Sequence, residues 1–168
     1  RFSVVAQVQK HKLDDSGYRS ATGLLGQWQR ELDRRSQVGA YAQWFALRFP
    51  DQGSRDANRA VVGATYVRGL EDQANTVVIG NAYVGKESVT GNLNELSFDL
   101  FGFRAAASRQ LAPKWRGSAS LSYEKRSYDA ADSFFGKRRS DSQVEIRIGA
   151  ERELDKRLSI SPQISFTR

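Results

Sequence analysis

The stretch "SLSYEKRSYDAADSFFGKRRSD" (120–141) places a charged, aromatic loop between two segments whose polarity alternates residue by residue. Before the loop, apolar or small side chains occupy every second position of 115–124, and Arg, Ser and Glu occupy the positions between them. After it, the same pattern returns over 144–151. Successive side chains of a strand point to opposite faces, so the pattern predicts two strands joined by the loop.

A period of two also runs through the rest of the chain. The last segment, 158–168, sets Leu, Ile, Pro and Phe against Ser, Gln and Thr. Most segments exceed ten residues, whereas globular strands average about 5 to 6 and tilted membrane strands need about 9 to 11. We therefore expect one all-β domain over 1–168, an antiparallel transmembrane β-barrel with about nine long strands. The six earlier segments are 1–11, 20–32, 37–49, 58–70, 75–87 and 94–111.

The connectors alternate in length, which is typical of outer-membrane barrels with tight periplasmic turns and longer outer loops. We expect short turns at 33–36, 71–74, 112–114 and 154–157, and longer loops at 12–20, 50–57, 88–94 and 128–141. Pro162 lies inside the last segment, which indicates an edge strand or a bulge. Aromatic residues near the predicted strand ends suggest interfacial girdles, although a soluble β-domain would use the same residues in its core. They are Phe2, Tyr18, Trp44, Phe49, Trp115, Tyr123 and Tyr128.

The composition excludes several classes of protein. No apolar run approaches the roughly 20 residues of a membrane helix. With no cysteine and one histidine, His11, sites built from thiolates or several histidines are excluded. The net charge of +7 is spread among acidic residues along the whole chain, which favours solvated loops and a polar lumen over a nucleic-acid surface. We expect no cofactor and no metal.

Five charged residues of the last segments are candidates for the lumen. Charge on the lipid face costs about 2 to 4 kcal/mol at mid-membrane, so Arg116 and Arg147 should face inward. There they would tune what the pore admits, or form salt bridges with Glu124, Glu145 or Glu151. A serine nucleophile would need a nearby base, which a single distant histidine does not supply, so we expect no enzyme.

The loop is the candidate contact with a partner. Its two phenylalanines are apolar residues in an exposed place, and its cations suit acidic cargo or lipopolysaccharide phosphates. Alternatively, the loop folds into the barrel mouth as a plug. The residues concerned are Asp132, Phe134, Phe135, Lys137, Arg138 and Arg139.

The last fifty residues or so resemble the C-terminal barrel of the surface lipoprotein assembly modifier family. The resemblance implies an outer-membrane β-barrel, usually preceded by a periplasmic tetratricopeptide domain, that helps lipoproteins to reach the cell surface. It is carried by Tyr128-Asp129, Asp132, Phe134-Phe135-Gly136, Lys137-Arg138-Arg139, Asp141 and the closing Phe166-Thr167-Arg168.

We expect this chain to be an incomplete portion of a longer protein, since it opens inside a strand, lacks tetratricopeptide helices and has an odd number of segments. The predicted function is a non-enzymatic translocation or assembly channel for surface-exposed lipoproteins in the bacterial outer membrane. Its expected partners are outer-membrane lipid and lipopolysaccharide, a lipoprotein cargo, and further strands or a tetratricopeptide domain of the same protein. Two alternatives stay open: a diffusion porin or polysaccharide-export channel on the same fold, and a soluble β-sandwich binding module.

Overall fold

The computed structural model describes residues 1–13, 16–71, 75–91, 93–155 and 158–168. Within these residues ten strands form one antiparallel sheet, and two single-turn 3₁₀ helices lie in connectors, so the all-β prediction is confirmed. The elements are β1 Phe2–Leu13, β2 Ser16–Glu31, β3 Ser36–Arg48, η1 Gly53–Arg55, β4 Ala57–Gly69, β5 Val77–Val89, η2 Asn94–Leu96, β6 Phe98–Ala112, β7 Trp115–Ala131, β8 Arg138–Glu153, β9 Ser159–Ile160 and β10 Gln163–Thr167.

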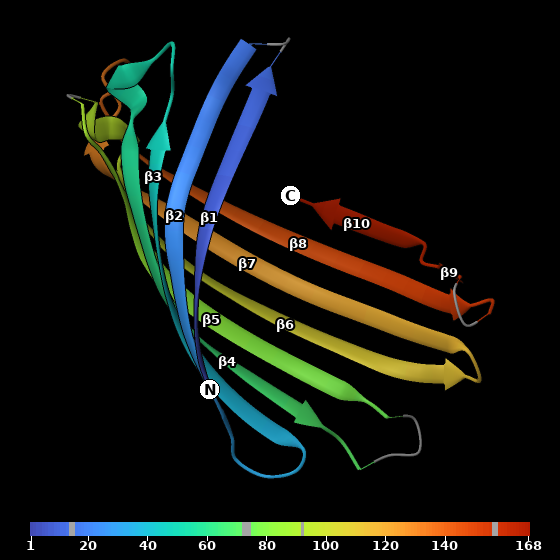
Figure 1. Cartoon of the computed structure of the whole chain (residues 1–168). Coiled ribbons are helices and arrows are strands. Elements are labelled where there is room, and N and C mark those ends of the chain that lie inside the picture. Colours follow the sequence, from blue (N-terminus) through green and yellow to red (C-terminus); the bar gives the residue numbers. More distant parts are fainter. Residues whose placement is uncertain (14–15, 72–74, 92, 156–157) are drawn as a thin grey trace.

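The strands follow one another as neighbours, in the order β1-β2-β3-β4-β5-β6-β7-β8-β10, and β9 also pairs with β8. The sheet curls into a trough that is not closed, with β1 along one edge and β9 and β10 along the other (Figure 1). The first eight strands are 12 to 17 residues long. An up-and-down order, long strands and strong curvature are consistent with part of a barrel.

Three predicted boundaries were wrong. The expected loop at 12–20 is largely strand, since β1 runs to Leu13 and β2 begins at Ser16, with a register shift at His11/Lys12. The expected loop at 128–141 shrinks to 132–137, because β7 and β8 extend into it. The ninth segment divides into β9 and β10 around Pro162, whose place at the sheet edge agrees with its missing N–H.

Contacts across the strands account for the longer β7–β8 hairpin. The Tyr128 ring packs on Phe98 with centroids 5.3 Å apart, and its hydroxyl donates to Asp141 Oδ2 at 3.2 Å. The guanidinium of Arg139 lies 5.0 Å from the centre of the same ring. These pairs stabilise the ladder beyond the segments where the alternation is clear. By register, Tyr128 lies on the same face of β7 as Glu124, whereas Trp115 and Tyr123 lie on the opposite face. The assignment of Tyr128 to an interfacial girdle with Trp115 and Tyr123 was therefore wrong.

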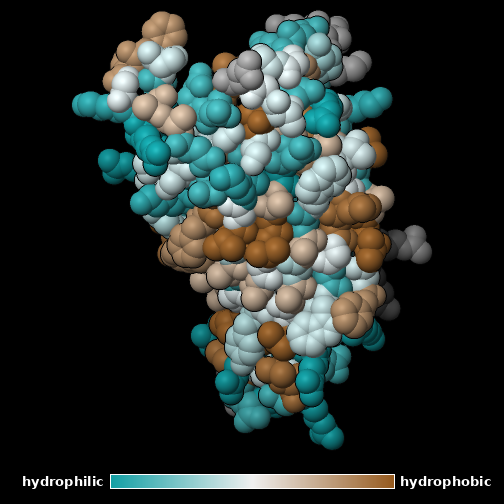
Figure 2. Space-filling model, turned by 90° about the vertical axis from the view of Figure 1, so that its left-hand side faces the viewer, coloured by the Kyte–Doolittle hydropathy of each residue, from teal (hydrophilic) through white to brown (hydrophobic). Residues whose placement is uncertain are grey.

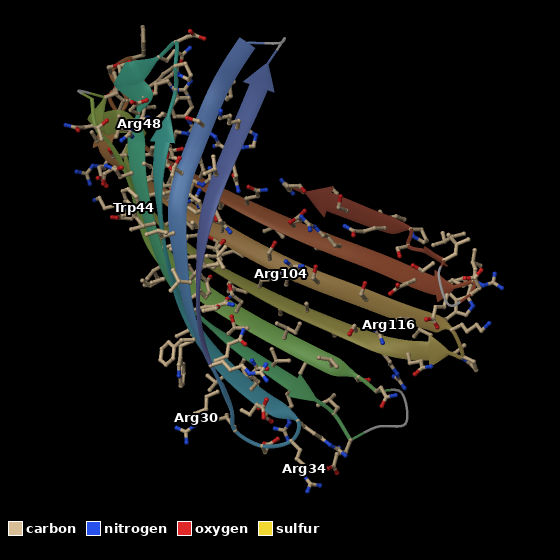
Figure 3. All side chains as sticks on the ribbon, viewed as in Figure 1. Arg30, Arg34, Trp44, Arg48, Arg104 and Arg116 are labelled. Atoms are coloured by element: carbon tan, nitrogen blue, oxygen red, sulfur yellow. The ribbon has the colours of Figure 1, made fainter. Side chains whose placement is uncertain are left out.

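The convex face of the sheet carries an apolar band. Figure 2 shows apolar residues gathered across the middle of this face, with hydrophilic residues above them. Leu24, Trp44, Val62 and Ile148 retain 47 to 62% of their surface exposed. Trp44 projects from this side, away from the trough (Figure 3). The sheet is a single layer in the part of the chain that the structure describes, so no second layer covers the band.

The concave face mixes polar side chains with two small apolar clusters. These clusters stabilise the end of the trough near the β7–β8 loop, since they join residues from β2 to β7. One contains Ala21, Phe45, Leu47 and Ala57, with Phe49 and Val89 against it; the other contains Val61, Phe98 and Leu100, with Tyr41, Tyr83 and Tyr128 against it.

Aromatic rings on the concave face lie over glycines of the neighbouring strand. Tyr41 is directly opposite Gly63, and Tyr83 is directly opposite Gly102. A Cβ added at Gly63 would meet Tyr41 Cζ at 2.5 Å, and one at Gly102 would meet Tyr83 Cζ at 2.3 Å. The missing side chains therefore let each ring lie flat across its neighbour strand and reach the strand beyond it.

Two turns at the opposite end of the sheet share the sequence Glu-Leu-Asp-Arg/Lys-Arg, at 31–35 and 153–157. In each, the aspartate side chain accepts a backbone N–H three residues later: Asp33 from Ser36 at 2.8 Å, and Asp155 from Leu158 at 3.1 Å. Asp33 also accepts the N–H of Arg35 at 2.7 Å, and this bond is the largest cause of its lowered pKa. The same local chemistry thus closes β2–β3 and the connection after β8.

Candidate functional site

The five charged residues predicted for the lumen lie on one face of the sheet, the concave one. Arg116 is opposite Glu151 in the β7–β8 pair, and Glu145 is opposite Ser122. Glu124 and Arg147 occur at the same alternate positions of β7 and β8. Figure 3 shows Arg116 and Arg104 projecting into the trough. The register therefore brings the five together on one face.

Their contacts differ from one residue to the next. Arg147 forms an ion pair with Glu145 at 2.7 Å, one of the pairs that the sequence suggested. Glu124 pairs instead with Arg126 at 2.6 Å, a residue that the sequence analysis had not singled out. Arg116 faces Glu151 in register without an ion pair between them.

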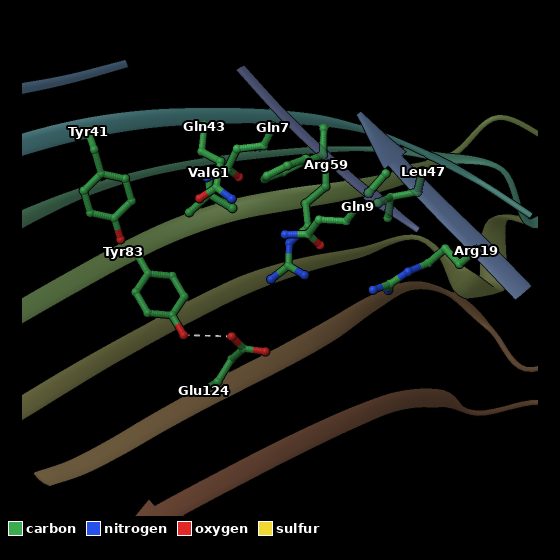
Figure 4. A pocket seen from close by; sticks show the side chains of 12 residues that line it. Gln7, Gln9, Arg19, Tyr41, Gln43, Leu47, Arg59, Val61, Tyr83 and Glu124 are labelled. Carbon is green, nitrogen blue, oxygen red and sulfur yellow. Dashed lines mark hydrogen bonds between the residues drawn. The ribbon is translucent and has the colours of Figure 1, made fainter. Parts of the chain in front are cut away.

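Polar side chains of β3 to β7 form a ladder of hydrogen bonds on the concave face, and Figure 4 draws its bond between Tyr83 and Glu124. Tyr41 donates to Asn81 Oδ1 at 3.4 Å, and Asn81 in turn donates to Thr65 Oγ1 at 2.9 Å. Tyr83 donates to Glu124 Oε2 at 2.7 Å. The ring of Tyr83 spans Gly102 of β6 to make this bond, because Gly102 is the register partner of Glu124. The glycines on this face therefore determine how far the tyrosines reach.

The ladder borders a cavity of about 350 Å³ on the concave face. Its polar lining includes two half-buried arginines, Arg19 of β2 and Arg59 of β4. Sequence reasoning missed both, together with Tyr41 and Tyr83. For Arg59 the sequence contained a signal, because Arg59 is the first of the alternate positions that lie on one face of the predicted strand 58–70. The remaining lining residues are Gln7, Gln9, Ala21, Gln43, Phe45, Leu47, Val61 and Glu124.

The predicted partner loop forms a compact turn at the tip of the β7–β8 hairpin. Asp132 Oδ1 accepts the N–H groups of Phe134 and Phe135 at 2.9 and 3.0 Å. Gly136 has φ of 63°, a conformation that glycine adopts without strain, and its N–H donates to the Asp132 carbonyl at 2.8 Å. The two phenyl side chains are 93% and 80% exposed, so neither packs onto the concave face as a plug would.

The three cations of the loop occupy different environments. Lys137 lies in the turn, whereas Arg138 and Arg139 already belong to β8. Arg139 is engaged, with an ion pair to Asp141 at 2.7 Å and the Tyr128 ring beneath it. The loop therefore presents two phenylalanines with Lys137 and Arg138 beside them.

No group of three or more His, Asp or Glu side chains suited to a metal ion occurs among the described residues. Within the same residues, no helix has the length and apolar character needed to cross a membrane.

Comparison with known proteins gives one family and no individual relative. No curated protein matches the chain, and no solved structure matches it. The family model described as "Surface lipoprotein assembly modifier" matches residues 1–167. This match extends the resemblance seen at the C-terminal fifty residues over the strands from β1 onward. The chain therefore belongs to the surface lipoprotein assembly modifier family, which has a role in the assembly of surface lipoproteins.

Proposed function

We propose that this chain is part of the wall of an outer-membrane β-barrel that serves as a non-enzymatic translocation or assembly channel for surface lipoproteins. The observation that carries the proposal is the contrast between the two faces of one sheet: an exposed apolar band crosses the convex face, whereas polar side chains surround two small apolar clusters on the concave face. A membrane barrel has this contrast, with lipid outside and a polar lumen inside.

The height of the convex band supports a membrane location. On β6 the outward residues between Asp99 and Arg109 are Phe101, Phe103, Ala105 and Ala107. The interval of ten residues, at about 3.3 Å each and a tilt of about 40°, spans about 25 Å along the membrane normal. This equals the apolar height of outer-membrane barrels. On β8, the outward positions between Ser142 and Arg152 are likewise apolar.

The open edges support a larger barrel. Unpaired backbone groups in lipid cost several kcal/mol each, so a spanning sheet must be closed. In this proposal, the free edges of β1 and β10 pair with further strands of the same protein, and a tetratricopeptide domain lies on the periplasmic side. A soluble sandwich would instead require a second sheet over the convex band.

The concave face and the hairpin tip supply the contacts with cargo. Arg, Glu, Gln and Tyr side chains on the concave face offer a passing polypeptide hydrogen bonds without a continuous apolar surface to hold it. The hairpin tip, with Phe134, Phe135, Lys137 and Arg138, is the proposed contact with the lipoprotein or with lipopolysaccharide at the outer surface. A diffusion porin on the same fold would conduct solutes and leave lipoprotein exposure unchanged.

A pair of adjacent substitutions tests the membrane location. Leu121 and Ser122 of β7 face the convex and concave sides. Leu121→Arg should destabilise the folded barrel by about 2 to 4 kcal/mol relative to Ser122→Arg, because only the first places a charge in lipid. The measurement is the unfolding free energy of the full-length protein in lipid vesicles. Equal costs for the two variants would contradict the membrane assignment.

Protease shaving of intact cells tests the channel role. Cells that express the full-length protein with a candidate lipoprotein should expose that lipoprotein to protease, and cells without the protein should not. The controls are outer-membrane fractionation and a folded form that migrates differently before and after boiling. Normal membrane insertion with unchanged lipoprotein exposure, together with solute conductance in planar bilayers, would favour the porin.

A further inference from the structure

The cavity on the concave face contains two guanidinium groups with spare hydrogen-bond donors. Arg59 forms no ion pair or hydrogen bond with any described residue. Among the described residues, Arg19 has one hydrogen-bond partner, His11, whose Nε2 lies 3.1 Å from Arg19 Nη2, and Arg19 Nε is buried without a partner. Figure 4 shows both side chains reaching into the same space from different strands. A buried donor without an acceptor, such as Arg19 Nε, is rare in folded proteins and calls for an acceptor. The donors of the half-buried Arg59 line the same cavity and can bond to the same acceptor.

The nearby carboxylates do not satisfy them. Glu124 is already engaged by Arg126 and Tyr83. Glu87 is the register partner of Arg59, yet the two side chains form no ion pair. Counting Arg19, Arg59 and Arg126 against Glu87 and Glu124 leaves one positive charge. An anion that enters the cavity therefore gains attraction without displacing an existing bond.

The rest of the lining suits a small, strongly accepting group. Gln7, Gln9 and Gln43 add amide donors around the arginines, and Tyr41 lines the same cavity. Planar guanidinium groups match carboxylate and phosphate oxygens, and such charge-assisted bonds are about twice as strong as neutral ones. The cavity of about 350 Å³ leaves room for one such group and its water.

We propose that Arg19 and Arg59 form an oxyanion-binding site on the concave face, which takes a carboxylate or phosphate group. The site adds a binding step to the proposed function, since in a channel it would bind an acidic side chain or a phosphate group of the passing molecule. It requires only the folded barrel and does not depend on transport.

The test is calorimetric titration of the full-length protein in detergent at low salt, with inorganic phosphate and, separately, with glutarate. We expect saturable binding of at least one probe. Arg59→Gln and Arg19→Gln should each weaken it about tenfold, as expected for the loss of a charge-assisted hydrogen bond. The matched control is Arg104→Gln, which removes the same charge from the same face but lies outside this cavity, and it should change the affinity less than about twofold.

The two probes distinguish the sources of the ligand. Binding of glutarate indicates acidic side chains, and binding of phosphate alone indicates phosphate groups. No saturable binding of either probe to the folded wild-type protein would overturn the proposal, as would an equal loss in Arg104→Gln, which would indicate diffuse lumen charge. Heat-modifiable migration checks that each variant is folded, and the shaving assay reports transport separately, so failure of one proposal is distinguishable from failure of the other.

Discussion

Substitution of Gly102 by alanine should destabilise the sheet through a residue on the neighbouring strand. The new Cβ would lie 2.3 Å from Tyr83 Cζ and 2.4 Å from its hydroxyl oxygen, so the ring must lift away from β6. Lifting the ring breaks the 2.7 Å bond to Glu124, whose other partner is Arg126. Hydrogen bonds to charged groups contribute about 1.5 to 3 kcal/mol, and the lower part of that range applies to this half-buried pair.

The control for this substitution is Gly80→Ala on β5. A Cβ at Gly80 meets nothing within 4 Å, so this variant measures the effect of adding a methyl group to a strand, which favours folding by about 0.5 to 1 kcal/mol. We expect Gly102→Ala to be less stable than Gly80→Ala by about 2 kcal/mol. The assay is urea unfolding of the full-length protein in lipid vesicles, followed by tryptophan fluorescence. Tyr83→Phe should cost little when added to Gly102→Ala, because the bond is already lost. Equal stabilities of the two alanine variants would refute the proposed contact between Gly102 and Tyr83.

Two further outcomes follow from the turns. The lowered pKa of Asp33 means that its charged form stabilises the folded state above the ordinary pKa of 3.8, and that this contribution disappears as the pH falls through the lowered value. The stability difference between wild type and Asp33→Asn, measured by thermal unfolding, should therefore shrink as the pH falls below the ordinary pKa of 3.8 and through the lowered pKa; a constant difference would contradict this reading. Replacement of Phe134 and Phe135 by serine should leave the thermal midpoint within about 2 °C, since both rings are exposed, and should reduce lipoprotein exposure in the shaving assay. Unchanged exposure would remove the tip from the proposed cargo contact.

The strands were predictable because each carries its own signal. Alternation is local, so 115–124 and 144–151 could be identified without knowledge of their neighbours. Strand ends were less predictable, because they depend on partners. β7 continues past Tyr128, where Phe98 and Arg139 pack on the tyrosine ring and Asp141 accepts a hydrogen bond from its hydroxyl. Local patterns do not contain such contacts.

The site was predictable only in part, for the same reason. The five charged residues expected to share a face come from two consecutive strands, so the single register between β7 and β8 determines whether they lie together. The cavity joins Arg19 and Arg59, which are separated by two strand pairings and forty residues. Nothing in either segment alone marks these arginines as neighbours.

The assignment of faces also depends on the connectors. Odd-numbered residues face the trough in β3, β4 and β5, as Tyr41, Gly63 and Tyr83 show. Even-numbered residues do so in β6 and β7, and Gly102 and Glu124 are examples. A shift of one residue exchanges the two faces of a strand. Whether odd- or even-numbered residues face the trough therefore cannot be inferred from the previous strand when the geometry of the connecting loop is unknown. The faces can be assigned only where one face is clearly apolar, as in β8, where Val, Ile and Ala alternate with charged residues. In β4 and β5, small residues on both faces weaken that contrast, so the polar surface of the trough emerges only when the pairing of all the strands is known.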